Sequence, residues 1–221
     1  MKLSLAVCLL LSLRLPALVR AQAAAPPPYT YLIQGRIGRL NAPAKVYLLQ
    51  GGQTLSSATL HDGLFAFAGT MPNPHPATLV LERQGQLQSG WGYQVIAGKE
   101  VGMPLDSPDR LPIYLEPGPV QLLGTDSLRT ARIISGMSTK QYQQLLRLEQ
   151  RAQPAPTTST GPDARTAFDD ASRALAQADL AFAKAHPALW VSLQALHQVH
   201  GSAYSPDYPE LASIYATLTP A

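Results

Sequence analysis

The sequence predicts an α+β protein with segregated elements: an N-terminal antiparallel β-sandwich or barrel, followed by an α-helical C-terminal region. Two observations predict this. Between residues 29 and 134, apolar side chains alternate with polar ones in about nine short runs separated by turn residues. After Gly136 the apolar side chains recur every three or four residues, which is typical of helices.

These changes of pattern also divide the chain of 221 residues. We expect a signal peptide at 1–21, an Ala/Pro tether at 22–28, a β-sandwich domain at 29–136, a helix at 137–153, a linker rich in Pro, Thr and Ser at 154–163 and a helical region at 164–221.

The first 21 residues have the layout of a secretory signal peptide. Lys2 precedes an apolar run, and a small-residue cleavage site ends at Ala21. Arg14 and Pro16 interrupt the run well before the roughly 20 residues that a membrane span needs. We therefore expect an exported protein of the periplasm or cell envelope, cleaved near Ala21, without stable membrane insertion.

Charge and cysteine content exclude some functions. The chain has 17 basic and 14 acidic residues, but Lys2, Arg14 and Arg20 belong to the signal segment, so 17 − 3 = 14 basic residues balance 14 acidic ones in the mature part. Without a basic excess we expect no nucleic-acid binding. Cys8, the single cysteine, also lies in the signal segment, so the mature chain has no thiol for a disulfide or for catalysis.

Turn signals place the strands in the β region. Gly51-Gly52-Gln53 separates Lys45–Gln50 from Thr54–Leu60 and predicts a hairpin, and Asp62-Gly63 predicts a second tight turn. The first strand is expected around Tyr29–Ile37, and the others at Leu64–Gly69, Ala77–Arg83, Tyr93–Ala97, Leu111–Leu115, Val120–Leu123 and Arg129–Ile134.

Spacing and caps place the helices. Ser138 and Gln141 form a capping box for the first helix. The long helix that ends near Ala185 carries large apolar side chains every seven residues, at Phe168, Leu175 and Phe182. Such a seam predicts helices packed along it, which the Tyr142–Leu146 and Leu189–Leu196 segments can supply, and a remaining strip for a partner.

No catalytic, cofactor-binding or metal-binding set is expected. His197 and His200 are one helical turn apart, but no acidic residue completes a zinc set. Glu116 and Asp109 are expected to be solvated loop charges. The candidates for a protein interface are large apolar side chains, namely Trp91, Tyr93, Phe168, Leu175 and Phe182.

Several stretches carry a family resemblance: Tyr31–Ile37, Ala44–Leu49, Asp62–Gly69 and Ile113–Gly118. In these the β region resembles the N-terminal domain of unknown function that precedes thioredoxin-like (AhpC/TSA, TlpA/ResA-type) disulfide reductases exported by Bacteroidota. Phe182–Pro187 and Ser192–Leu196 resemble the helical connector of the same proteins.

In that family the connector continues into a thioredoxin fold with two redox cysteines, whereas this chain stops at Thr219-Pro220-Ala221. No catalytic residue of the family maps onto this sequence. The resemblance therefore implies a non-catalytic interaction or positioning module without a cofactor, whose partner is a thioredoxin-fold protein or a second copy. Two alternatives stay open: a split or truncated thiol-disulfide oxidoreductase component that needs a separate thioredoxin-fold chain, and a protein that binds a small apolar ligand inside the β domain.

Overall fold

The computed structural model describes residues 27–87, 91–96, 99–104, 109–152, 162–200 and 208–219, without the side chains of 91–96, 99–104 and 162–165. The expected signal peptide, its cleavage site and most of the expected linker lie outside the described residues.

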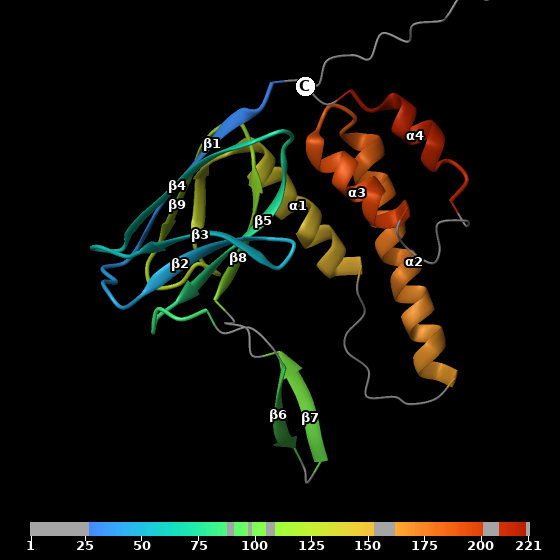
Figure 1. Cartoon of the computed structure of the whole chain (residues 1–221). Coiled ribbons are helices and arrows are strands. Elements are labelled where there is room, and N and C mark those ends of the chain that lie inside the picture. The colour runs from blue at the N-terminus through green and yellow to red at the C-terminus, as the bar shows by residue number, and fades with distance from the viewer. Residues whose placement is uncertain are drawn as a thin grey trace, which may run out of the picture.

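In the described part of the chain, eight strands form two four-stranded sheets (Figure 1). Sheet A has the order β10 (Arg132–Ser135), β9 (Gly118–Gly124), β1 (Tyr29–Ile37), β4 (Leu64–Met71). Sheet B has the order β3 (Gln53–Thr59), β2 (Lys45–Gln50), β5 (His75–Glu82), β8 (Arg110–Leu115). Two further strands, β6 (Trp91–Ile96) and β7 (Lys99–Pro104), pair with each other.

Four helices follow the strands in the described residues: α1 (Met137–Ala152), α2 (Pro162–Ala185), α3 (Trp190–His200) and α4 (Leu211–Thr217). The predicted fold class, a β-sandwich followed by a helical region, is confirmed. The long helix α2 begins two residues before the position expected for it. None of the described helices combines the length and the hydropathy needed to cross a membrane.

Sheet A differs from the expected antiparallel pattern, because β1 and β9 run parallel, with Ile33 opposite Val120. A parallel pair needs a long crossover connection. Here the residues between the two strands supply that connection, since they build β4 and all of sheet B before the chain returns. The alternation of side chains is the same in parallel and antiparallel strands, so it did not disclose the direction.

The two sheets share one apolar core, to which the inward side of each strand contributes. On β1, Ile33 and Ile37 are buried while Gln34 and Arg36 point outward. Leu48, Leu79 and Ile113 approach from sheet B and are fully buried. Each such side chain contributes about 1.5–3 kcal/mol through burial, so the packing of alternate residues holds the sheets together.

The predicted hairpin turn is present at Gly51 and Gly52, whose φ angles of 54° and 82° suit the short connection between β2 and β3. At the second turn, Gly63 has a φ of 75°, and a Cβ atom there would lie 2.5 Å from the carbonyl oxygen of Gly38. A side chain at position 63 would therefore collide with the backbone of a neighbouring turn.

Helix α1 starts directly after sheet A and is held to the turn between β8 and β9 by Glu116. The Glu116 carboxylate accepts hydrogen bonds from the backbone N–H groups of Ser138 (2.8 Å) and Thr139 (2.9 Å). Two sequence expectations are therefore wrong. Glu116 is not a solvated charge, since only 6% of it is exposed. The backbone N–H of Ser138, which the predicted capping box assigned to the Gln141 side chain, donates to this carboxylate instead.

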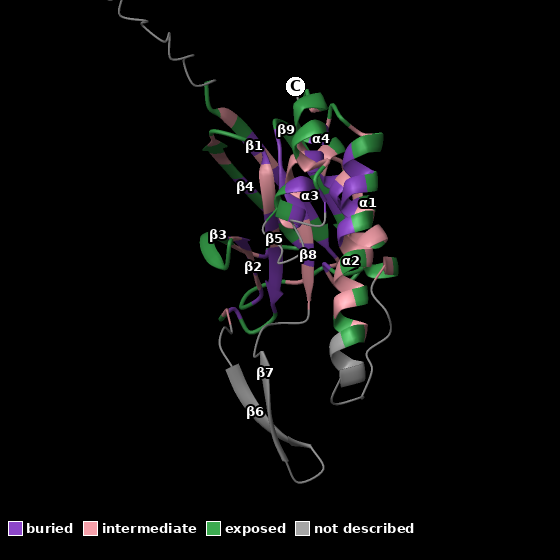
Figure 2. Cartoon of the chain, turned by 90° about the vertical axis from the view of Figure 1, so that its right-hand side faces the viewer, coloured by how far each residue is buried: buried purple, intermediate pink, exposed green. Residues whose placement is uncertain are grey.

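The helices form two apolar clusters beside the sandwich. One joins Tyr142 and Leu145 of α1 to Phe182 of α2, Val191 of α3 and Tyr114 of β8. Figure 2 shows buried positions in purple on α1, α3 and β5. The other cluster joins α2 to α3 and α4. The first and third helices thus both contact α2, as the sequence predicts.

Only part of the predicted seam on α2 is buried, because Phe182 packs against α1 and α3 while Leu175 is half-buried. Ala176, Leu180 and Ala183 are buried against α3 and α4, whereas Phe168 is 67% exposed. Helix α3 has 11 residues and α2 has 24, so α3 is too short to cover the whole of α2. The repeat of seven residues therefore did not predict which positions of α2 are buried, because this depends on where α1, α3 and α4 contact the helix.

Candidate binding cleft

A cavity of about 890 Å³ lies between the β-sandwich and the last two helices. The sandwich supplies the segment Asn73–His75 and the side chain of Tyr114, while α3 and α4 supply the opposite walls. Its larger side chains are Trp190, Leu193, Leu196, Tyr208, Leu211 and Tyr215. We call this cavity the cleft.

Tyr114 fixes the inner wall of the cleft. It lies on the outer side of β8, where its ring meets the ring of Tyr142 with the centroids 5.6 Å apart. Its hydroxyl donates a hydrogen bond to the backbone oxygen of Trp190 at 3.3 Å. Burial is the main cause that raises the pKa of Tyr114 far above its ordinary value. The phenol is therefore neutral at physiological pH and links the sandwich to the start of α3.

His75, at the start of β5, supplies a neutral polar group. Burial lowers the pKa of His75 below its ordinary value, although a hydrogen bond with the backbone of Asn73 opposes this effect. Its Nε2 atom lies within hydrogen-bonding distance of the Gln50 side-chain amide. The Gln50 amide N–H can donate only to an unprotonated Nε2, so this contact fits the neutral imidazole.

Tyr29 binds the loop that precedes His75. Its hydroxyl donates to the backbone oxygens of Leu115 (2.9 Å) and Asn73 (3.2 Å). Burial, with a smaller effect of Glu116, raises the pKa of Tyr29 to about 12. The loop is thus tied to the end of β8 by a group that stays neutral over the physiological range.

Helix α4 forms the outer wall and is tied to the rest of the helical region at both ends. The hydroxyl of Tyr208 donates to the backbone oxygen of Arg173 at 3.2 Å, and the backbone N–H of Thr219 donates to the Pro187 oxygen at 2.9 Å. Tyr215 nevertheless stays 65% exposed. The wall is anchored, but a large aromatic side chain on it is uncovered.

The cleft can hold an uncharged, mainly apolar group. Leucine and aromatic side chains dominate its lining, and Tyr114 and His75 are neutral near pH 7. Such a lining, with a few convergent polar groups, is typical of ligand pockets of this size. His197 and His200 lie on the lining and are exposed, but no group of three or more potential metal ligands occurs among the described residues.

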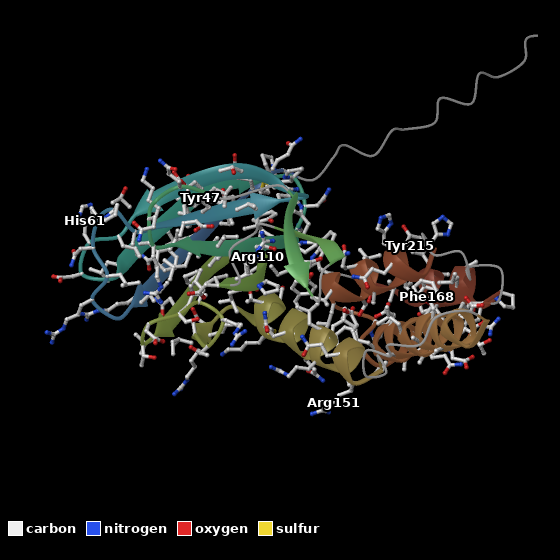
Figure 3. The ribbon with its side chains drawn as sticks, turned by 90° about the horizontal axis from the view of Figure 1, so that it is seen from below. Tyr47, His61, Arg110, Arg151, Phe168 and Tyr215 are labelled. Atoms are coloured by element: carbon white, nitrogen blue, oxygen red, sulfur yellow. The ribbon has the colours of Figure 1, made fainter. Side chains whose placement is uncertain are left out.

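The predicted interface residues lie elsewhere, and the structure does not bring them together. Phe168 is exposed near the start of α2, Leu175 is half-buried, and Phe182 is 3% exposed within the cluster that joins α1, α2 and α3. Phe182 therefore packs inside the chain and is not an interface side chain. The side chains of Trp91 and Tyr93 lie outside the described residues. Figure 3 shows Phe168 and Tyr215 on the helical region, with Tyr47 and His61 on the sandwich.

The sequence interpretation missed a pair of carboxyl groups between α1 and α2. The carboxyl groups of Glu149 and Asp179 are neighbours, and Asp179 is 1% exposed. Burial first, then the charge of Glu149, raises the pKa of Asp179 to about 8, and burial also raises the pKa of Glu149. Neither residue lines the cleft. A signal was present, because Glu149 follows the apolar spacing of its helix.

The sequence interpretation also missed the cleft, although Leu193 and His200 share the predicted apolar face of their helix. The lining comes from four separate parts of the chain, around residues 73–75, 114, 190–200 and 208–215. They meet because the helices pack on one side of the sandwich, which periodicity does not disclose.

The fold and the cleft define a β-sandwich protein with a helical extension and a concave site at their junction. The chain belongs to the family described as a domain of unknown function (DUF4369), whose model matches residues 31–142. The matched span takes in both sheets and the beginning of α1. The prediction that the β region is a domain of unknown function is thus confirmed. No curated protein and no solved structure matches the chain.

Proposed function

We propose that the protein is an exported, non-catalytic interaction module, and that the cleft is the site where a protein partner inserts an apolar segment. The observation that carries the proposal is the open apolar lining. Tyr215 of α4 is exposed and Leu193 of α3 is half-buried, and both line the cleft. Exposed aromatic side chains beside a pocket are typical anchors of interfaces.

The proposed partner is a separate thioredoxin-fold protein of the same compartment, with a second copy of the chain as the alternative. The support is the resemblance of the β region and of the connector helices to the accessory half of exported disulfide reductases. The absence of cysteine after Cys8 in the sequence fits a chain that leaves thiol chemistry to its partner. In the related alternative, the chain and the thioredoxin-fold protein are the two components of a split thiol-disulfide oxidoreductase.

Binding measurements with purified proteins test this proposal. The mature chain is immobilised, and thioredoxin-fold proteins exported by the same cell are passed over it. Leu193→Glu places a charge on the cleft wall and should weaken binding at least about tenfold. Leu55→Glu is the matched control, because Leu55 is a 42% exposed leucine on β3 that does not line the cleft. Equal effects of the two variants would contradict the site, and no binding would contradict the partner.

A second candidate function is the binding of a small apolar ligand, and the volume of the cleft favours it. About 890 Å³ lies within the range of pockets for drug-sized molecules. The location differs from the sequence expectation, since the cleft lies beside the β domain. The test is titration with cis-parinaric acid, a fluorescent fatty acid, followed by competition with dodecanoate. Saturable binding at one site that Leu193→Glu abolishes and Leu55→Glu retains would favour this candidate over a protein partner.

A further inference from the structure

A second concave surface lies away from the cleft, where α1 meets β10 and the turn before β10. It encloses about 360 Å³. Its lining includes Arg129 and Arg132 on one side, Lys140, Gln143 and Arg147 of α1 on the other, and Leu111 at its base. We call this surface the basic groove. It shares no residue with the cleft.

The groove concentrates positive charge in a chain whose mature part is balanced. Four cationic side chains line it, and among the described residues no aspartate or glutamate does so. None of the four forms an ion pair within the described part of the chain. The carboxylate of Asp109 does not line the groove; it accepts hydrogen bonds from the Ser127 hydroxyl (2.7 Å) and the backbone N–H of Arg129 (3.0 Å).

The polar side chains that α1 contributes to the groove follow the axis of this helix. Lys140, Gln143 and Arg147 are three and seven residues apart on one face of α1, and seven residues of helix span about 10 Å. Two of these side chains also bind the backbone of neighbouring strands: the Lys140 ammonium donates to the Ile134 oxygen at 2.8 Å, and the Gln143 amide donates to the Pro112 oxygen. The groove thus combines cations of two origins: Arg129 and Arg132 from β10 and the turn before it, and Lys140 and Arg147 from α1.

We propose that the basic groove binds an acidic segment of a protein, with several aspartate or glutamate side chains in succession. Charge complementarity supports this occupant, because four unpaired cations face a groove without a lining carboxylate. The separation of about 10 Å along α1 between Lys140 and Arg147 suits several separate carboxylates better than a single compact anion. Ala131 and Ile133, which are half-buried, also line the groove and can contact the methylene groups of such side chains.

Fluorescence anisotropy with a labelled decaglutamate peptide and the full mature chain tests the proposal. The variant Arg132→Gln/Arg147→Gln removes one cation from each side of the groove and should weaken binding about tenfold or more. The matched control is Arg36→Gln/Arg39→Gln, which removes two exposed arginines that do not line the groove and changes the net charge equally. The control should change the affinity for decaglutamate less than about twofold. Salt at about 0.15 M should weaken the binding of decaglutamate by the wild type and by both double variants, compared with low salt.

The proposal would be overturned by no binding of decaglutamate, by an equal loss in the two double variants, or by tighter binding of heparin or a single-stranded oligonucleotide than of the peptide. Unchanged melting temperatures show that the variants are folded. If the groove variant melts lower than wild type, Arg129→Gln provides an independent test, because its exposed guanidinium lines the same groove. Binding of decaglutamate that Arg129→Gln leaves unchanged would also overturn the proposal.

Discussion

The Glu116 carboxylate, buried at the turn between β8 and β9, accepts a hydrogen bond from the backbone N–H of Thr139 at 2.9 Å. Its second oxygen binds the N–H of Ser138. A carboxylate at this end of a helix also interacts favourably with the helix dipole. Gly136, whose φ is 106°, lets the chain turn at this point, and a Cβ atom there would lie 3.0 Å from a Glu116 oxygen. These contacts join the sandwich to the helical region.

Replacing Glu116 should therefore destabilise the protein. Glu116→Ala leaves two helix N–H groups without this acceptor and should lower the free energy of unfolding by about 2 kcal/mol. Urea denaturation followed by circular dichroism measures the change. Ser138→Ala is the control, because it retains the backbone N–H that binds Glu116, and it should cost less than about 0.5 kcal/mol. If Ser138→Ala costs as much as Glu116→Ala, then the serine hydroxyl is the effective cap.

Two phenylalanines on α2 should respond very differently to the same substitution. Phe182→Ala empties a buried position between α1 and α3 and should cost about 3–5 kcal/mol. Phe168→Ala removes a side chain that is 67% exposed and should change the stability by less than about 0.5 kcal/mol. Thermal unfolding of the two variants makes the comparison. A large loss for Phe168→Ala would show that this side chain is buried in solution, for example by a second copy.

The carboxyl pair of Glu149 and Asp179 should make stability depend on pH. Folding raises the pKa of Asp179 to about 8, so the folded state binds the proton more tightly than the unfolded chain. The stabilisation is complete below the unfolded value near 4 and is lost as the pH rises towards 8. Asp179→Asn should flatten this dependence and should make the protein at least about 1 kcal/mol more stable at pH 8.

Chemical denaturation at pH 5 and pH 8 tests this prediction. Asp170→Asn is the control, since Asp170 is exposed and its ion pair with Arg173 is a long surface contact, at 4.0 Å. The Asp170 variant should follow the pH dependence of the wild type. An Asp179→Asn protein that loses stability between pH 5 and pH 8 as steeply as the wild type would contradict the assignment of the proton to this pair.

Zinc should not stabilise the protein. His197 and His200 supply two exposed imidazoles one helical turn apart, whereas structural zinc takes four ligands. We expect the melting temperature at stoichiometric zinc to equal that of the metal-free protein. A rise of several degrees that His200→Ala abolishes, and that the distant control His61→Ala retains, would identify a metal site at the edge of the cleft.

Much of the architecture follows from local patterns in the sequence. Alternation placed the strands, as on β1, because one side of a strand faces the core. Spacing of three and four residues placed the helices for the same reason. The turn at Gly51-Gly52 was also predictable, since a two-residue hairpin requires positive φ angles that glycine adopts readily.

The tertiary structure alone decided which of these elements meet. The parallel pairing of β1 with β9 and the pairing of Glu149 with Asp179 join residues far apart in the sequence, so no local pattern contains them. The sequence predicts Glu116 to be a loop charge, because the contact of its carboxylate with the backbone N–H groups of α1 depends on the tertiary structure. The cleft arises in the same way, because its walls come from the sandwich and from α3 and α4. Periodicity determines which face of an element avoids water, whereas the packing of whole elements determines which faces cover one another and which remain open.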